Sequence, residues 1–161
     1  MTAKTPASPQ ELPSKDRLRL WLKILKTVRF IEAELRENLR TEFQSTLPRF
    51  DVMAALHRYP AGLKMGELSG VLKVSNGNVT GIVDRLVDEG HVVRESVPGD
   101  RRAARVRLTS RGRDEFIVQA AAHEAWINGL LQAVDSAQAD EISLIFDQIL
   151  APHFGQNLND H

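Results

Sequence analysis

The chain has 161 residues, no cysteine, and equal numbers of basic and acidic residues, 21 of each. This length fits one domain with an extension, and the lack of cysteine excludes disulfides, thiolate metal ligands and cysteine-based redox sensing. No apolar run approaches the roughly 20 residues that span a bilayer and the N-terminus lacks the apolar core of a secretory signal, so we expect a cytoplasmic protein without a membrane partner.

The net charge of zero hides a strong asymmetry along the chain. Residues 1–113 contain all 21 basic residues and 13 of the acidic ones, whereas residues 114–161 contain 8 acidic residues and no Lys or Arg. Seven Arg between His91 and Arg113 face only Glu95 and Asp100. Such a separation is typical of a protein with one surface that meets a polyanion, although an uneven scatter of surface charges is the alternative.

The N-terminal part predicts a disordered arm over residues 1–15 and a long helix over Asp16–Phe43. Apolar residues recur in this helix at spacings of three and four, which makes one stripe. The stripe consists of Leu18, Trp21, Leu25, Val28, Ile31, Leu35 and Leu39, widened by Leu20, Leu22, Ile24 and Phe30. A helix this apolar near a terminus is expected to meet a partner subunit.

Three shorter helices are predicted next. Thr46 is a candidate N-cap for the first, which ends at Tyr59-Pro60. The core positions of this helix are Phe50, Val52, Met53 and Leu56. A small strand at Leu63–Met65 precedes a helix from Gly66 to Leu72, whose inward residues are Leu68, Val71 and Leu72.

Ser75 is the expected N-cap of the third short helix, and Gly90 its C-cap. One face of this helix carries Val79, Ile82, Val83, Leu86 and Val87. The last two of these short helices, joined by a tight turn, predict a helix-turn-helix.

A hairpin is predicted directly after the helix-turn-helix. His91–Glu95 forms one strand, Val97–Asp100 supplies turn residues, and Ala104–Leu108 alternates basic and apolar residues as a half-buried strand does. Thr109 or Ser110 then caps a helix to about Ala133, and Asp135 or Ser136 caps a last helix that Pro152 stops. The aromatic residues expected in a dimerisation core are Trp21, Trp126, Phe146 and Phe154.

The second helix of the helix-turn-helix carries polar residues off its apolar face. Asn pairs with adenine and Thr contacts a thymine methyl group, and a helix N-terminus holds a phosphate. Gly77 and Gly81 each lower helix propensity by about 1 kcal/mol, and a missing side chain permits close approach to DNA. The DNA-binding residues predicted here are Ser75, Asn76, Asn78, Thr80 and Arg85. A solvated polar face is the alternative.

The stretch from Leu18 to Phe154 resembles the multiple antibiotic resistance regulator (MarR) family of winged helix-turn-helix transcription factors. The resemblance is carried by Asp100-Arg101-Arg102, by Val106-Arg107-Leu108-Thr109 with Gly112, and by Val79–Gly90. These segments are similar to the D-x-R wing, the L-T-x-x-G exit and the recognition helix of the family.

The resemblance implies a mainly α fold with a small β wing, in which N- and C-terminal helices dimerise. The expected parts are the arm (1–15), a dimerisation helix (16–47), the winged helix-turn-helix (48–112), C-terminal dimerisation helices (113–154) and a flexible tail (155–161). The resemblance also implies a homodimeric repressor on an inverted repeat in double-stranded DNA. It assigns Arg102 to the minor groove. Because DNA would repel a carboxylate aimed at it, Asp100 is expected to hold the Arg or the turn in place, while Arg101, Arg105 and Arg107 contact phosphates or stay solvated.

Family members are usually released from DNA by small, often aromatic, acids that bind between the dimerising helices and the DNA reader. The candidate ligand residues are Arg29, Arg36, Arg40 and His57. Ion pairs along the helix with Glu32, Glu34 and Glu37 are the alternative for the basic residues of this set. The segments Leu47–Met53 and Val74–Thr80 also resemble a branch that controls catabolism of aromatic, hydroxycinnamate-like compounds, in which some members respond to acyl-CoA thioesters.

An enzyme is not expected, because the chain has no Gly-rich phosphate loop, nucleophile elbow or HExxH motif. No cofactor and no metal site are expected either, although His123 and His153 could meet in space. The alternative function is a winged-helix module for protein–protein contact without sequence-specific DNA binding. Such a module would not need seven Arg around the hairpin.

Overall fold

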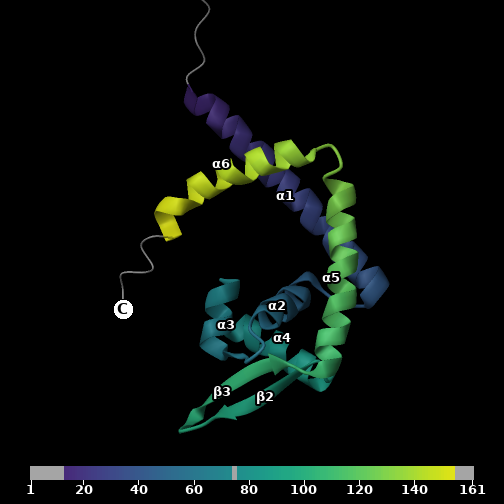
Figure 1. The fold of residues 1–161 in the computed structure, drawn as a ribbon, viewed down its shortest axis with the longest axis vertical. Coiled ribbons are helices and arrows are strands. Elements are labelled where there is room, and N and C mark those ends of the chain that lie inside the picture. Colours follow the sequence, from purple (N-terminus) through teal and green to yellow (C-terminus); the bar gives the residue numbers. More distant parts are fainter. Residues whose placement is uncertain (1–12, 74–75, 155–161) are drawn as a thin grey trace, which may run out of the picture. The chain divides into compact units, whose positions relative to one another are not determined.

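The computed structural model describes residues 13–73 and 76–154, which are mostly helical (Figure 1). The elements are α1 (Pro13–Phe43), α2 (Leu47–Arg58), β1 (Leu63–Lys64), α3 (Met65–Leu72), α4 (Asn76–Asp88), β2 (Val92–Val97), β3 (Asp100–Leu108), α5 (Ser110–Leu130) and α6 (Ser136–Phe154). The three strands form one antiparallel sheet in the order β1-β3-β2. The predicted fold class, helices with a small β wing, is confirmed.

The chain divides into two compact units, Met1–His123 and Glu124–His161, and α5 runs across the boundary. In the first unit, α2, α3 and α4 pack against one another and the hairpin β2–β3 projects beside them (Figure 1). No helix in the described part of the chain is long and apolar enough to cross a membrane.

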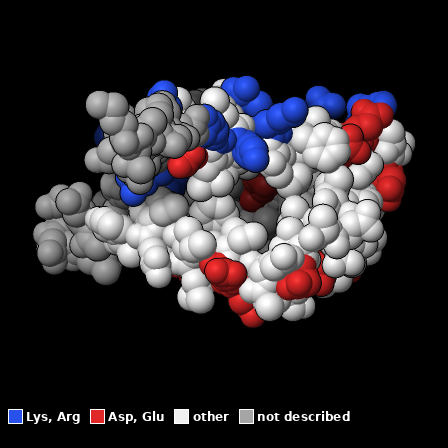
Figure 2. All heavy atoms as spheres, turned by 90° about the horizontal axis from the view of Figure 1, so that it is seen from above, with Lys and Arg blue, Asp and Glu red and all other residues white. Residues whose placement is uncertain are grey.

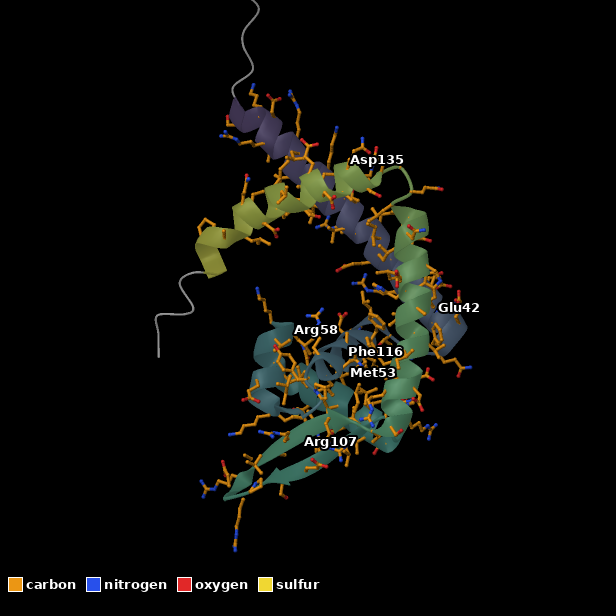
Figure 3. The ribbon with its side chains drawn as sticks, viewed as in Figure 1. Glu42, Met53, Arg58, Arg107, Phe116 and Asp135 are labelled. Atoms are coloured by element: carbon orange, nitrogen blue, oxygen red, sulfur yellow. The ribbon has the colours of Figure 1, made fainter. Side chains whose placement is uncertain are left out.

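The core of the first unit is shared by the three short helices and the sheet. Its fully buried side chains include Val52, Met53, Leu56, Leu68, Val79, Val83, Leu86 and Val106. Burying one such side chain contributes roughly 1.5–3 kcal/mol. The apolar face predicted for α4 is confirmed at its centre, and Ile82 and Val87 lie at its partly exposed edges. Phe116 of α5 is also buried, with its ring centroid 5.5 Å from that of Phe50 (Figure 3).

Side-chain caps fix where the helices begin. The Thr46 hydroxyl accepts from the backbone N–H of Arg49 at 3.3 Å, as predicted. At α6, the Asp135 carboxylate accepts from the N–H of Gln138 at 2.9 Å, and the Gln138 side chain accepts from the N–H of Asp135. This reciprocal pair is a capping box, so Asp135 rather than Ser136 caps α6.

The start of α5 is tied to the end of α4 by one hydroxyl group. Thr109 Oγ1 accepts from the N–H of Gly112 at 3.0 Å and donates to the carbonyl oxygen of Gly90 at 2.7 Å. Gly90 ends α4 with φ of +77°, a left-handed conformation that favours glycine. Thr109 is therefore the cap of α5, and it also fixes the start of this helix against the C-terminal end of α4.

The structure differs from the sequence-based predictions at several element ends. α1 begins at Pro13, three residues before the predicted start, and β3 begins at Asp100 because its pairing with β2 continues to Val97. The prediction for Val71 is wrong: it is 40% exposed, because α3 turns Leu68 and Ser69 inward instead. Pro152 does not stop α6, which continues to Phe154; the proline lies within the last turn. The predicted tail, 155–161, lies outside the described residues.

Candidate nucleic-acid interface

The exposed face of α4 is the first part of the candidate interface. Asn78, Thr80 and Arg85 are exposed on it, opposite the buried apolar face. A Cβ atom added at Gly77 or Gly81 would meet no atom within 4 Å, so packing inside the protein does not require glycine at either position. Ser75 and the Asn76 side chain, which belong to the predicted site, lie outside the described residues. The described part of α4 thus offers polar groups beside an open, side-chain-free surface.

The tip of the hairpin β2–β3 is the second part. Gly99 turns the chain with φ of +83°, and the Asp100 carboxylate accepts from the backbone N–H of Arg102 at 3.0 Å. This hydrogen bond stabilises the turn. The Asp100 carboxylate therefore binds the backbone of its own turn, although two Arg residues follow it in sequence. Arg101 and Arg102 are both exposed, and neither guanidinium forms an ion pair with a carboxylate in the described ranges. We call these two residues the tip arginines.

Two other Arg residues of the hairpin form ion pairs within the protein. Arg107 donates to Glu95 across the two strands at 2.5 and 2.8 Å (Figure 3 shows Arg107 on the hairpin). This hydrogen bond lowers the pKa of Glu95 and raises that of Arg107. Arg94 of β2 pairs with Asp84 of α4 at 2.5 Å, and this ion pair joins the hairpin to α4. Arg107 was predicted to meet phosphates or solvent, and in the DNA-free chain it meets a carboxylate.

Arg105 has a different environment from its neighbours. It is half-buried, and its Nε atom is buried without a hydrogen-bond partner in the described structure. Its Cγ atom lies 2.8 Å from where a Cβ atom at Gly62 would stand, so Gly62, at φ of +87°, leaves room for the Arg105 stem. Arg105 was predicted to contact phosphates or stay solvated, and its stem instead lies beside Gly62, directly before β1.

A cluster of charged residues that the sequence analysis did not bring together lies at the C-terminal end of α4. We call Arg49, Arg85, Glu89 and His91 the Glu89 cluster. Glu89 accepts from Arg49 of α2 and lies 3.8 Å from Arg85 Nε and 4.0 Å from His91 Nε2. Burial lowers the pKa of Arg49 and of His91. The cluster joins α2, the end of α4 and the start of β2, and it therefore holds helix and wing in one position.

The candidate ligand residues on α1 are spread over its surface. All Lys and Arg residues of this helix are exposed: Lys15, Arg17, Arg19, Lys23, Lys26, Arg29, Arg36 and Arg40. On the face shown in Figure 2, Lys and Arg gather mainly along one edge. Arg36 pairs with Glu32 at 3.1 Å and Arg40 with Glu37 at 2.6 Å, the ion pairs that the sequence offered as the alternative. His57 is exposed, with its ring 4.8 Å from that of Phe116.

Acidification is expected to destabilise the folded protein through two histidines. Burial holds the pKa of His91 and of His123 below the usual value of 6.5. The unfolded chain therefore binds these protons more readily, so stability that is complete above pH 6.5 is lost as the pH falls through that value. Urea unfolding at about pH 7.5 and about pH 5.5 measures the loss, because free His titrates between them. The double variant His91→Gln, His123→Gln should lose less stability between these pH values than the wild type does. An equal loss would show that other groups cause the pH dependence.

Known proteins share this arrangement of elements. The family model described as "MarR family" matches residues 45–103. A MarR family transcriptional regulator from Silicibacter pomeroyi is 37% identical, with a TM-score of 0.75 and coverage of 89% of this chain and 99% of that one. Sco3205 of Streptomyces coelicolor, a MarR family regulator solved in complex with DNA, is 22% identical over 91% of each chain, with a TM-score of 0.76.

Similarity to curated relatives is restricted to part of their length. The transcriptional activatory protein BadR of Rhodopseudomonas palustris is 35% identical over 77 residues, which are 47% of this chain and 44% of BadR. The chain thus spans less than half the length of the curated relatives that it matches. The relative from Silicibacter pomeroyi, in contrast, is covered almost completely at 37% identity. On that similarity, this chain belongs to the MarR family of transcriptional regulators.

Proposed function

We propose that this protein is a homodimeric transcriptional regulator that binds double-stranded DNA through α4 and the tip of the wing. The observation that carries the proposal is the pair of tip arginines, which are exposed without an ion-pair partner among the described residues. An exposed cation contributes most binding free energy at a phosphate or in a groove of DNA when no carboxylate already neutralises it. Sco3205, which was solved in complex with DNA, has the same fold, and this supports a role of the fold in DNA binding.

The two elements suit the two grooves of B-form DNA. The major groove admits an α-helix whose Asn and Thr side chains reach base edges, and α4 exposes Asn78 and Thr80. The minor groove attracts Arg inserted from a narrow projection, and the hairpin tip carries Arg102 where the turn is braced by Asp100. The ion pair between Arg94 and Asp84 fixes the angle between helix and hairpin.

Replacing Gly81 with Ala is expected to separate stability from DNA binding. The site has open space for a Cβ atom, so the free protein should gain about 1 kcal/mol from helix propensity. If DNA approaches the glycine closely, the added methyl group should weaken binding about tenfold, or 1.4 kcal/mol. Urea unfolding and fluorescence anisotropy measure the two effects.

The matched control is Gly129→Ala, another helical glycine with no atom within 4 Å. It should stabilise the protein in the same way and leave DNA binding unchanged. Unchanged DNA binding by Gly81→Ala would mean that α4 does not approach DNA along this face.

A second copy of the chain is the expected partner of the exposed apolar residues. Trp21, Leu22 and Phe30 of α1 are each more than half exposed, as are Leu144 and Ile149 of α6. Large apolar side chains exposed in this number mark an interaction site. The two copies of α4 on an inverted repeat must also be held about 34–36 Å apart, which a dimer provides.

The other aromatic residues predicted for the dimer interface differ in exposure. Phe146 is exposed and Trp126 is partly exposed, while the Phe154 side chain lies outside the described residues.

Equilibrium sedimentation tests the assembly. The wild-type chain should sediment with twice its monomer mass. Ile149→Glu places a charge on the apolar surface and should shift the equilibrium toward monomer, whereas Gln148→Glu, the same charge at the adjacent polar position, should not. A wild-type monomer at micromolar concentration would contradict the proposal.

A small organic acid is the proposed signal, and repression is the proposed mode. Members of the family that the sequence resembles are usually repressors released by such acids; the relative BadR, in contrast, carries the description of an activatory protein. A reporter gene placed behind the bound operator distinguishes the two modes. Repression predicts higher expression when the gene for this protein is deleted, and lower expression contradicts it.

DNA binding itself is tested by a salt titration. Phosphate contacts release counterions, so affinity should fall steeply and linearly on logarithmic axes as salt rises. Fluorescence anisotropy with a labelled duplex between about 50 and 200 mM salt gives the slope. A flat titration, or no binding at low salt, would instead favour a winged-helix module for protein contact.

A further inference from the structure

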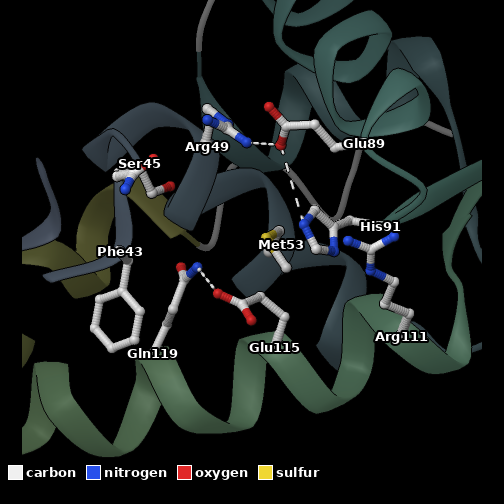
Figure 4. Close-up of a pocket in the computed structure, with 10 residues that line it drawn as sticks. Phe43, Ser45, Arg49, Met53, Glu89, His91, Arg111, Glu115 and Gln119 are labelled. Carbon is white, nitrogen blue, oxygen red and sulfur yellow. Dashed lines mark hydrogen bonds and ion pairs between the residues drawn. The ribbon is translucent and has the colours of Figure 1, made fainter.

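Glu89 lies between two Arg side chains, one packed within the fold and one exposed on α4. Its Oε2 atom accepts from Arg49 of α2 and lies 4.0 Å from Nε2 of His91. Figure 4 shows both contacts at the same oxygen, while the other oxygen points away from the pocket that these residues line. That other oxygen, Oε1, lies 3.8 Å from Nε of Arg85. One carboxylate thus joins α2 to an exposed Arg of α4.

Arg49 anchors this carboxylate. The Arg49 side chain is only 15% exposed and that of Glu89 is 35% exposed, so neighbouring atoms restrict the rotamers of both. The backbone N–H of Glu89 also donates to the carbonyl oxygen of Arg85 at 3.1 Å, which places Glu89 one helical turn after Arg85. Because Arg49 already binds Oε2, the position of Oε1 is fixed before Arg85 meets it.

Arg85 has no other carboxylate partner among the described residues, and its side chain is 73% exposed. An exposed ion pair between residues four apart on a helix contributes little to stability. Its effect on direction is larger. Long side chains on a helix lean toward its N-terminus, and Glu89, which lies on the C-terminal side, attracts the guanidinium the other way. The contact therefore restricts where Arg85 points.

The nitrogen that faces Glu89 is the one that a base contact can spare. A guanidinium recognises guanine by paired hydrogen bonds to O6 and N7, and its two terminal nitrogens can supply them. Glu89 approaches Nε of Arg85. In the ranges 13–73 and 76–154, neither Nη1 nor Nη2 of Arg85 forms a hydrogen bond or an ion pair. The fork of Arg85 is thus oriented by Glu89 and open to a base.

We propose that Glu89, held by Arg49, is a positioning residue that orients Arg85 to recognise a guanine in the major groove; this inference rests on the proposed binding of DNA through α4. A side chain that is already oriented loses less conformational freedom on binding, which strengthens its contact with guanine. It gains nothing at a base that cannot accept both hydrogen bonds. Glu89, although acidic, thus contributes sequence selectivity, while the charge of Arg85 contributes affinity for any DNA.

Fluorescence anisotropy at fixed salt tests this role as a ratio of two affinities. One duplex is the selected operator, and in the other an A·T pair replaces the G·C pair that Arg85 recognises. Arg85→Lys identifies that pair, because Lys keeps the charge and lacks the planar fork. We expect Glu89→Gln to lower the ratio about two- to tenfold, the effect of ordering one long side chain. A ratio equal to that of the wild type overturns the proposal.

Two further variants separate positioning from a purely structural or electrostatic effect. Asp88→Asn removes the same charge from the adjacent exposed position and should leave the ratio unchanged. In the double variant Arg85→Lys, Glu89→Gln, the ratio should equal that of Arg85→Lys alone, because Glu89 acts through the fork. A further loss in the double variant would show that Glu89 acts through the fold, and would overturn the proposal.

Nuclear magnetic resonance relaxation of the wild-type, DNA-free chain tests the orienting contact without any substitution that could unfold the protein. The Nε–H group of Arg85 should have a higher order parameter than that of Arg58, an exposed Arg that forms no ion pair in the described part of the chain. Equal order parameters would overturn the proposal, since Glu89 would then leave Arg85 as mobile as a free side chain.

These results distinguish the two proposals. A wild-type protein that binds no DNA sequence preferentially refutes the proposed function and, with it, any base selected by Arg85. A wild-type protein that prefers its operator, together with an unchanged ratio in Glu89→Gln, refutes only the role of Glu89.

Discussion

Replacing Arg102 with Ala is expected to weaken binding to the preferred operator by about 1–3 kcal/mol, the value of one Arg that reads a groove. The guanidinium is exposed at the wing tip and forms no ion pair in the described ranges, so nothing within the protein offsets its loss. The turn should survive, because Asp100 accepts from the backbone N–H of residue 102, which Ala retains. Fluorescence anisotropy at fixed salt measures the change.

Arg101→Ala is the matched control for this prediction. It removes the same charge from the adjacent position, where a phosphate contact is expected. It should reduce affinity for operator and for unrelated DNA about equally and lower the salt slope by about one. Arg102→Ala should instead reduce the ratio of the two affinities. Identical behaviour of the two variants would show that Arg102 contributes only charge.

Replacing Gly112 with Ala is expected to destabilise the fold by about 3 kcal/mol, the upper end for overpacking a closed site. A Cβ atom at this position would stand 2.0 Å from the carbonyl oxygen of His91 and 2.8 Å from its carbonyl carbon. Both are backbone atoms, so no side chain can turn away to relieve the clash. The N–H of Gly112 also donates to the Thr109 cap, and any shift of α5 would strain that bond.

Urea unfolding monitored by circular dichroism measures this loss, with Gly129→Ala as the control on the same helix. Gly129 has open space around it and should gain up to about 1 kcal/mol. A stability change below about 0.5 kcal/mol in Gly112→Ala, the usual range for a harmless surface substitution, would contradict the contact. The clash also explains physically why a glycine follows Thr109 by three residues at the exit of the wing.

Local patterns predicted the elements of the reading head well. The spacing of Val79, Val83 and Leu86 predicted the buried face of α4, and alternation in β3 predicted that Val106 and Leu108 are buried. Thr46 and Gly90 predicted helix ends because capping depends on neighbours within four residues. Val71 failed because a helix of only eight residues has too few apolar positions to fix which side faces inward.

Contacts between distant residues could not be predicted in the same way. Arg49 and Glu89 are 40 residues apart, and no periodicity indicates that α2 brings them together. The pair of Arg107 with Glu95 is diagonal, because the register sets Glu95 opposite Arg105 and Val93 opposite Arg107. Long side chains reach such diagonal neighbours, but the choice of partner depends on the register that the folded hairpin adopts. The sequence count of seven Arg therefore overstated the free positive charge, because Arg94 and Arg107 pair with carboxylates.

We propose that α4 and the wing tip together read a DNA sequence. Selection of bound duplexes from a random library, with wild-type protein and with Arg102→Ala, tests it most directly. Wild-type protein should enrich an inverted repeat whose half-sites lie about 10–10.5 base pairs apart, and Arg102→Ala should lose preference mainly at the positions that the wing reaches. Enrichment of no sequence by the wild type, or the same enriched sequence with the same strength from both proteins, would contradict it.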